Sequence, residues 1–283
     1  MGASVTTFPP EARTAFAELY PTRPGKLRHA LGAHPLLSPE ALARLAEALP
    51  ADSVEHNPGA LPIAIAPEDV PSLWCGVGET IRGIAVAGAW VVLKRIEQVE
   101  EYRDLLRTIL GEIEDIVVPR TGRTHQLEGF VFVSSPEAVT PFHFDPEHNL
   151  LLQLRGSKTM TVFPARDERL LPAEAQEAFH LGKHHRNLHW REDFSALGTP
   201  FELAPGEALH VPVKAPHWVK NGPEPSVSLS LTWRSEWSYA EADARALNRV
   251  LRRIGVSPRP PGVFPASNRG KALAWRALRR LRA

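Results

Sequence analysis

The segment from Leu127 to about Trp233 constrains the fold most, because it consists of short β-rich runs separated by turn residues. A series of short strands with frequent turn signals is typical of a β-sandwich or a double-stranded barrel. The expected strands cover 130–133, 141–145, 149–154, 158–163, 201–203, 208–211, 218–219 and 227–233. We expect 149–154 and 158–163 to pair as a hairpin around Arg155-Gly156-Ser157.

Amphipathic helices are expected on both sides of this segment. Ser38-Pro39-Glu40 combines an N-cap, a proline at the first helical position and an acidic first turn, and Pro50 ends that helix. The other expected elements are a buried strand over 90–93, a helix from Glu97, and helices over 240–254 and 271–281. We therefore predict a helical region packing on the barrel over 1–88, a β-rich core over 89–239 and C-terminal helices over 240–283.

Composition and charge exclude several classes of protein. The 283 residues carry 33 Lys+Arg against 32 Asp+Glu, a net charge of +1 that gives no reason to expect a nucleic-acid partner. A hydrophobic content of 43% is too high for a disordered chain. Because no apolar run reaches the length of a membrane span and Cys75 is the single cysteine, we expect a cytoplasmic protein without disulfides or a multi-cysteine zinc site.

His143 and Asp145 are two residues apart in an expected strand, so both side chains point to the same face. Pro216-His217-Trp218 lies in a later strand, which can arrive from the other side of the barrel with a third ligand. Two histidines and one carboxylate make a facial triad that leaves coordination positions open, as non-haem Fe(II) oxygenases require. We therefore predict a metal site at His143, Asp145 and His217.

The same alternation predicts which other side chains face the candidate ligands. The inward set is Asn149, Leu151 and Gln153, and the outward set, packed against helices, is Leu150, Leu152 and Leu154. Lys158 is either a solvated strand end or the cation for a buried carboxylate. A polar face on the last strand either lines a pocket or faces water, and the sequence leaves both open; it consists of Ser226, Ser228, Ser230 and Thr232.

Several separated motifs occur in an order that points to one known family. They are Thr140-Pro141-Phe142-His143-Phe144-Asp145, Asn149, Gln153-Leu154-Arg155-Gly156-Ser157-Lys158, Pro205-Gly206-Glu207, Val211-Pro212 and Pro216-His217-Trp218. Over about Trp90 to Trp237 the chain resembles the Jumonji C group of 2-oxoglutarate oxygenases, and within it the branch of the asparaginyl hydroxylase of hypoxia-inducible factor. The resemblance implies a mainly β fold with flanking α-helices, organised as a double-stranded β-helix (jelly-roll, cupin/JmjC) barrel.

Carried over by position, the resemblance implies His143, Asp145 and His217 as Fe(II) ligands. It implies Lys158 and Thr140 as partners of the distal carboxylate of the cosubstrate 2-oxoglutarate, with Asn149 on the cosubstrate side. The family often has asparagine where this chain has Thr232, which is the corresponding cofactor-side candidate. O2 would be the second cosubstrate, and the activity would be a dioxygenase reaction that releases succinate and CO2.

Two classes of function remain open. The first is an oxygenase that hydroxylates, or demethylates through hydroxylation, a protein side chain, a peptide or a small molecule. The second is a cupin-like metal-binding or regulatory module without turnover. Lys158 beside an intact triad favours the enzyme, because a binding cupin needs no cation opposite its metal.

Three further features of the sequence are expected to lie outside the metal site. The His180–His189 cluster, with Lys183 and Arg186, is expected to be a solvated segment that borders the pocket mouth. His210 is expected to be a hydrogen-bonded core histidine. Apolar side chains at helical spacing beyond Ala240 predict a homodimer contact through the C-terminal helices, and the alternative is that both helices fold back onto their own barrel; these side chains are Leu247, Val250, Leu251, Ile254, Leu273, Trp275, Leu278 and Leu281.

Overall fold

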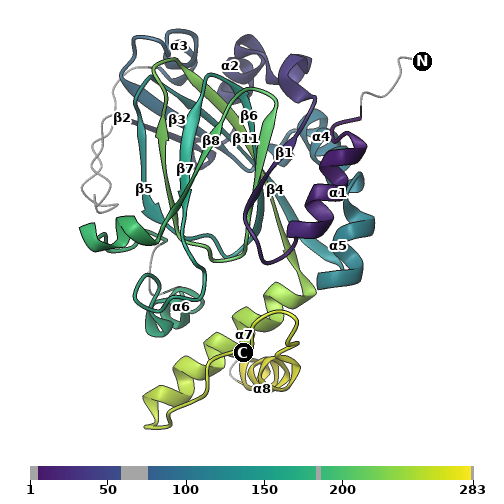
Figure 1. Cartoon of the computed structure of the whole chain (residues 1–283), viewed down its shortest axis with the longest axis vertical. Helices are drawn as coiled ribbons and strands as arrows, with labels where there is room; N and C mark the ends of the chain where they lie inside the picture. The colour runs from purple at the N-terminus through teal and green to yellow at the C-terminus, as the bar shows by residue number, and fades with distance from the viewer. Residues whose placement is uncertain (1–5, 59–75, 183–185, 282–283) are drawn as a thin grey trace.

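Two antiparallel sheets form the centre of the molecule in the computed structural model, which describes residues 6–58, 76–182 and 186–281 (Figure 1). The larger sheet has the strand order β1-β9-β6-β11-β4-β3-β2, and the smaller has the order β5-β10-β7-β8. The strands are β1 (Gly25–Arg28), β2 (Val54–Pro58), β3 (Ala89–Lys94), β4 (Thr124–Ser134), β5 (Val139–His143), β6 (His148–Arg155), β7 (Lys158–Val162), β8 (Thr199–Leu203), β9 (Glu207–Val211), β10 (His217–Asn221) and β11 (Ser226–Ser235). The predicted β-rich segment is confirmed.

Helices cover the outer face of the larger sheet (Figure 1). The described α-helices are α1 (Pro10–Leu19), α2 (Pro39–Ala48), α3 (Val77–Arg82), α4 (Glu100–Gly111), α5 (Glu114–Thr121), α6 (Ala173–Phe179), α7 (Glu236–Arg253) and α8 (Arg269–Arg280). The predicted N-cap of α2 is confirmed, because the Ser38 hydroxyl accepts the Ala41 N–H at 3.2 Å. Phe16, Leu42 and Leu106 from three of these helices pack in one core with Leu150 and Leu231 of the sheet. Because the helices cover this face of the larger sheet, a pocket can form only at its other face, toward the smaller sheet.

The alternation along β6 follows the prediction. Leu150, Leu152 and Leu154 lie in the core with the helices, whereas Asn149 and Leu151 line a pocket between the sheets. On β11 every residue is buried, so its serine and threonine face does not face water. Ser230 and Thr232 line the same pocket. The larger sheet therefore has one apolar face toward the helices and a mixed face toward the pocket, on which polar side chains of β6 and β11 lie beside apolar ones such as Leu151.

The predicted hairpin between β6 and β7 is wrong. β6 pairs with β9 and β11, whereas β7 pairs with β8 and β10 in the other sheet. Gly156 allows the crossing because its φ of +62° is unfavourable for other residues, and a Cβ there would lie 2.2 Å from the Pro225 carbonyl oxygen. A short turn containing glycine is compatible both with a hairpin and with a chain that passes from one sheet to the other. The choice depends on strands distant in sequence, β8 to β11, with which β6 and β7 pair.

Two strands in the region expected to be helical were missed. β1 pairs with β9 at one edge of the larger sheet, and β2 pairs with β3 at the other. At four and five residues these strands are too short to show a clear alternation in the sequence. The chain before residue 59 therefore contributes to the sheet as well as covering it.

The predicted C-terminal helices are present as α7 and α8, which lie below the sheets in Figure 1 and contact each other. α7 begins at a capping box in which Ser235 and Ser238 exchange hydrogen bonds. It also contacts α6 and the end of β11. Among the described residues, no helix combines the length and apolarity needed to cross a bilayer. Cys75 lies outside the described residues.

Candidate active site

A pocket of about 490 Å³ lies between the two sheets and receives side chains from both. β5, β7 and β10 supply one wall, and β6, β11, β4 and β3 supply the other. Every site residue predicted from the sequence lines it: Thr140, His143, Asp145, Asn149, Lys158, His217 and Thr232. The structure thus brings together residues spread over about a third of the chain.

His143, Asp145 and His217 form the one group of histidine and acidic side chains with metal-binding spacing among the residues the structure describes. The Asp145 Oδ2 atom lies 3.9 Å from His143 Nε2 and 3.6 Å from His217 Nε2. His217 stands directly opposite His143 in the ladder between β10 and β5. The third residue therefore comes from the neighbouring strand of the same sheet, and not from the other side of the barrel as expected.

Hydrogen bonds fix the orientation of both imidazole rings. His143 Nδ1 donates to the Pro141 carbonyl at 2.7 Å, and His217 Nδ1 donates to the Ala215 carbonyl at 2.9 Å. A ring nitrogen that faces a carbonyl oxygen must carry the proton, so each Nε2 keeps its lone pair. Both lone pairs are available beside the Asp145 carboxylate, as in histidine metal ligands held by a backbone carbonyl.

The charge states of these groups suit a cation. Burial, helped by the nearby His143, lowers the pKa of His217 to about 4, so its ring is neutral at neutral pH. Burial alone would raise the pKa of Asp145, but Arg186 and the two histidines outweigh it and lower the pKa to about 2. A carboxylate and imidazole nitrogens are donors that divalent first-row metal ions bind.

Lys158 lies in the same pocket and is buried, so it is not a solvated strand end. Its Nζ donates to the Ser228 hydroxyl at 2.8 Å. Burial lowers its pKa to about 7, and among the described residues no carboxylate forms an ion pair with it. A buried ammonium with only a neutral partner is costly unless an anion completes its environment.

Asn149 and Thr232 face each other across β6 and β11. The Asn149 side-chain oxygen accepts a hydrogen bond from Ser230 at 2.8 Å, and the Thr232 hydroxyl donates to the Glu128 carbonyl at 3.3 Å. Thr140 lines the pocket from β5. These neutral groups lie in the pocket that also holds the triad and Lys158.

The sequence analysis missed Arg186 as a site residue. Its guanidinium donates to Asp145 Oδ1 at 2.7 Å and to Glu147 Oε1 at 3.3 Å. The Leu188 N–H donates to the Phe142 carbonyl at 2.9 Å, which holds the segment after Arg186 along β5. No pattern in the sequence indicates this contact, because Arg186 and Asp145 are 41 residues apart and meet only in the folded chain.

The other residues of the His180–His189 segment differ from one another. His189 is exposed as expected, but His180 is not solvated, because its Nε2 atom is enclosed between α6 and its neighbours. Residues 183–185, which include two histidines of the cluster, lie outside the described residues. His210 is the hydrogen-bonded core histidine that we predicted, with Nδ1 donating to the Arg23 carbonyl at 2.8 Å.

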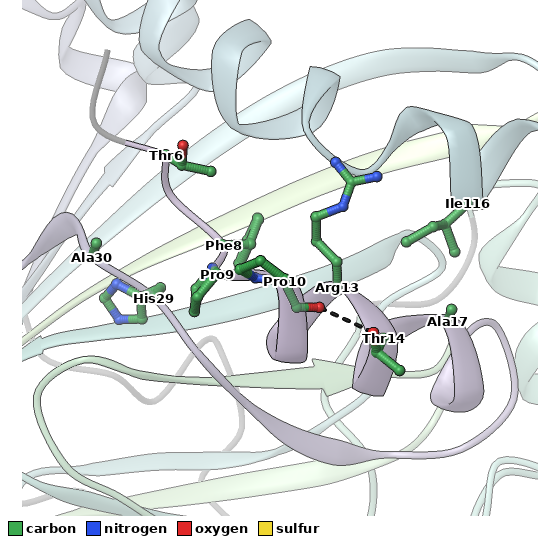
Figure 2. A pocket seen from close by; sticks show the side chains of 10 residues that line it. All are labelled: Thr6, Phe8, Pro9, Pro10, Arg13, Thr14, Ala17, His29, Ala30 and Ile116. Atoms are coloured by element: carbon green, nitrogen blue, oxygen red, sulfur yellow. Dashed lines mark hydrogen bonds between the residues drawn. The ribbon is translucent and has the colours of Figure 1, made fainter. Parts of the chain in front are cut away.

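A second hollow, shown in Figure 2, lies beside α1 and the end of β1. Its polar groups already have partners: His29 bonds the Gln153 carbonyl and the Leu31 N–H, and Arg13 pairs with Asp115. Thr14 donates to the Pro10 carbonyl within α1 (Figure 2). This groove therefore has none of the unmatched charge found between the sheets.

Comparisons with known proteins agree on the fold. The chain is 34% identical over 104 residues to Jumonji C domain-containing protein 5 of Drosophila melanogaster, a match that covers 34% of this chain and 25% of that protein. An X-ray structure of Escherichia coli YcfD superposes with a TM-score of 0.52 at 17% identity, covering 94% of this chain and 66% of YcfD. No protein-family model matches.

A further structure, of YcfD described as a ribosomal oxygenase in complex with cobalt and 2-oxoglutarate, gives a TM-score of 0.48 at 17% identity. It covers 95% of this chain and 65% of that one. At 17% identity, structural similarity indicates a shared fold and no more. The evidence for that shared fold is the superposition with a TM-score of 0.52. The chain spans less than two thirds of the length of each of these proteins.

Proposed function

We propose that this protein is an Fe(II)- and 2-oxoglutarate-dependent oxygenase. One observation carries the proposal: a triad of two histidines and one aspartate shares a pocket with a buried lysine that has no acidic partner among the described residues. The triad offers a metal ion three donors and leaves coordination positions free. The lysine offers a cation to a ligand that also reaches the metal, and 2-oxoglutarate, with a carboxylate at each end, has that shape and charge.

The residues present fit both groups. His143, Asp145 and His217 would hold Fe(II), since both Nε2 lone pairs and Asp145 Oδ2 converge. When bound, the iron and 2-oxoglutarate supply the oxidising chemistry, in which O2 is consumed and succinate and CO2 are released. The protein orients the two histidines through the two backbone carbonyls and keeps the His217 imidazole neutral through burial.

The opposite end of the pocket would bind the distal carboxylate. Lys158 supplies the positive charge and Thr140 a hydroxyl, while Asn149 and Thr232 border the cosubstrate. Binding a carboxylate would give the buried Lys158 the anionic partner it lacks. Thr232 retains one donor group where related proteins often have the amide of asparagine, so this contact is expected to be weaker.

The finer family assignment belongs to this proposal. We infer that the two sheets are the walls of a double-stranded β-helix and that the chain is a Jumonji C protein close to the asparaginyl hydroxylase branch. The match to a Jumonji C domain-containing protein supports the first part. The division into 1–88, 89–239 and 240–283 remains our prediction, with β1 and β2 joining the core sheet.

We propose a protein or peptide side chain as the substrate class, with a small molecule as the alternative. YcfD, which shares the fold, is described as a ribosomal oxygenase, and this supports a protein substrate. The pocket lining also includes Phe130, Phe132 and the ion pair of Lys94 with Glu55. Hydroxylation and demethylation through hydroxylation use the same initial oxidation of a C–H bond.

The test is an anaerobic titration with Fe(II) and 2-oxoglutarate, followed by measurement of succinate after O2 is admitted. We expect tight binding of both and succinate release that increases with the correct substrate. Asp145→Ala should abolish succinate formation while the fold persists, because two donors hold the metal poorly. Metal binding without succinate formation would instead support the cupin-like binding or regulatory module.

A homodimer and a cytoplasmic location also remain predictions. Apolar side chains on the C-terminal helices are exposed in the single chain: Ile254, Leu273 and Leu281. Sedimentation of Leu273→Glu against the unchanged protein tests the dimer, and a monomeric unchanged protein contradicts it. A point variant is preferable to truncation near Tyr239, which would remove Glu241, the ion-pair partner of the buried Lys214.

A further inference from the structure

The two oxygens of Asp145 have different partners. Oδ2 is the atom nearest the histidines, at 3.9 Å from His143 Nε2 and 3.6 Å from His217 Nε2. Oδ1 accepts a hydrogen bond from Arg186 Nη1 at 2.7 Å. A guanidinium N–H at this distance engages the carboxylate oxygen that it faces. Asp145 is therefore oriented so that one oxygen, Oδ2, faces the position a metal ion would take.

Arg186 is itself held at both ends. Its Nη2 lies 3.3 Å from Oε1 of Glu147, a buried carboxylate, so the guanidinium bridges two acids. Its backbone carbonyl accepts the Phe144 N–H at 3.2 Å, which ties Arg186 to the chain directly before Asp145. The planar fork of arginine suits this bridge, and the single ammonium of lysine does not reproduce it.

Charge alone would argue against an arginine beside a metal site. A guanidinium next to Asp145 repels a divalent cation and weakens the carboxylate as a ligand. Glu147, on the other side of the guanidinium, offsets part of this repulsion in its ionised form, although burial raises its pKa to about 7. The arrangement therefore keeps the geometric effect of the arginine on Asp145 while reducing its electrostatic cost.

We infer that Arg186 is a positioning residue that restricts Asp145 to binding the metal through one oxygen. This inference rests on the proposed function. An octahedral ion with three protein donors has three positions left, of which bidentate 2-oxoglutarate takes two. If Asp145 bound through both oxygens, it would fill the remaining position. Arg186 thus keeps a coordination position open for O2.

Two measurements on Arg186→Met test this role without relying on turnover. Anaerobic calorimetry gives the affinity for Co(II), and electron paramagnetic resonance gives the binding of nitric oxide, a substitute for O2, to the Fe(II) and 2-oxoglutarate complex. We expect Co(II) affinity to be retained or raised, because the freed Asp145 can bind through both oxygens and the repulsion from the guanidinium is removed. At saturating metal and cosubstrate, we expect the nitric oxide signal to be weakened or lost.

Conservative and control variants complete the experiment. Arg186→Lys should recover part of the signal, and Glu147→Gln should have a smaller effect because its amide oxygen still accepts from Arg186. Arg191→Met is the matched control, since Arg191 belongs to the same connection between strands but pairs with the exposed Asp193, and it should behave as the unchanged protein. Circular dichroism checks that each variant is folded.

The outcomes separate the two proposals. An unchanged nitric oxide signal in Arg186→Met, with Co(II) still bound, would overturn the role of Arg186 and leave the oxygenase proposal intact. Failure of the unchanged protein to bind metal and 2-oxoglutarate would overturn the proposed function and, with it, this inference.

Discussion

Two lysines, Lys214 and Lys158, are buried in different surroundings among the described residues, and the comparison contrasts a charge paired with a carboxylate and one beside a hydroxyl. Lys214 lies between the sheets and α7, where its Nζ pairs with Glu241, which also pairs with Arg245. Lys158 lies in the pocket, and its described partner is the hydroxyl of Ser228. Both side chains are buried to a similar extent. The described residues therefore give one cation a carboxylate and the other only a hydroxyl, as the proposed binding of a cosubstrate carboxylate by Lys158 requires.

The backbone of Lys214 shows what its pairing is for. Its N–H donates to the Asp145 carbonyl at 2.7 Å, at a residue with a φ of +63°. The ion pair with Glu241 thus anchors the loop that supports the candidate ligand to α7. Lys214 and Arg245 lower the pKa of Glu241 to about 2 although burial opposes this, so the carboxylate stays charged.

The largest expected effect comes from breaking the paired lysine. Glu241→Gln leaves Lys214 buried without a counter-charge, and removing one partner of a buried ion pair typically costs about 3–5 kcal/mol. Urea denaturation should show this loss in the free energy of unfolding. The control is Glu236→Gln. Glu236 lies on α7, as Glu241 does, but forms an exposed ion pair with Arg123, so this variant should cost less than about 1 kcal/mol. Equal losses in the two variants would remove the distinction drawn for Lys214.

Lys158→Met should have the opposite profile. It breaks no ion pair, so we expect the free energy of unfolding to be unchanged or higher. The affinity for 2-oxoglutarate should fall about 10- to 150-fold, because a charge-assisted hydrogen bond contributes about 1.5–3 kcal/mol. Anaerobic calorimetry on the metal-loaded protein measures this affinity, and metal affinity should be retained. An unaltered affinity for 2-oxoglutarate would show that Lys158 does not bind it.

The pH dependence of cosubstrate binding sharpens the same point. Burial lowers the pKa of Lys158 to about 7, so above that pH the free protein must take up a proton to bind a carboxylate. The affinity for 2-oxoglutarate should therefore fall as pH rises, approaching about tenfold per unit well above pH 7. Calorimetry in buffers of different ionisation enthalpy should show proton uptake at pH 8. Persistence of the full pH dependence in Lys158→Met would assign it to another group.

The smallest effect is expected for a neutral group beside Lys158. Thr140→Val removes a hydroxyl and keeps the side-chain shape, and a neutral hydrogen bond contributes about 0.5–1.5 kcal/mol. The affinity for 2-oxoglutarate should fall about 2- to 12-fold. A loss as large as that of Lys158→Met would mean that charge does not dominate binding at this end of the pocket.

The part of the site that depends on alternation could be predicted from the sequence. His143 and Asp145 share a face because their strand has a period of two, and the same rule placed Asn149 and Leu151 toward the pocket. The rule gives the face of a side chain but not the partner of its strand. It therefore could not show that β6 and β7 belong to different sheets.

Contacts between distant segments account for what the sequence did not predict. Arg186 reaches Asp145 only because its segment runs along β5, and nothing in residues 180–189 indicates that neighbour. The basic composition around Arg186 is typical of a solvated loop, and it therefore predicts exposure and not a contact with Asp145. The pairing of Lys214 with Glu241 likewise depends on where α7 packs after β11.

The placement of β1 has a consequence for how the chain is assembled during synthesis. Gly25 pairs with His210, so the strand made early at one edge of the larger sheet has its partner only after β9 is complete. At about 5–20 residues per second, that interval is on the order of 10 to 40 s. During it Leu27, which the finished core buries, lacks its ladder partner Ala208. Among the described strands, β1 therefore waits longest for the strand it pairs with.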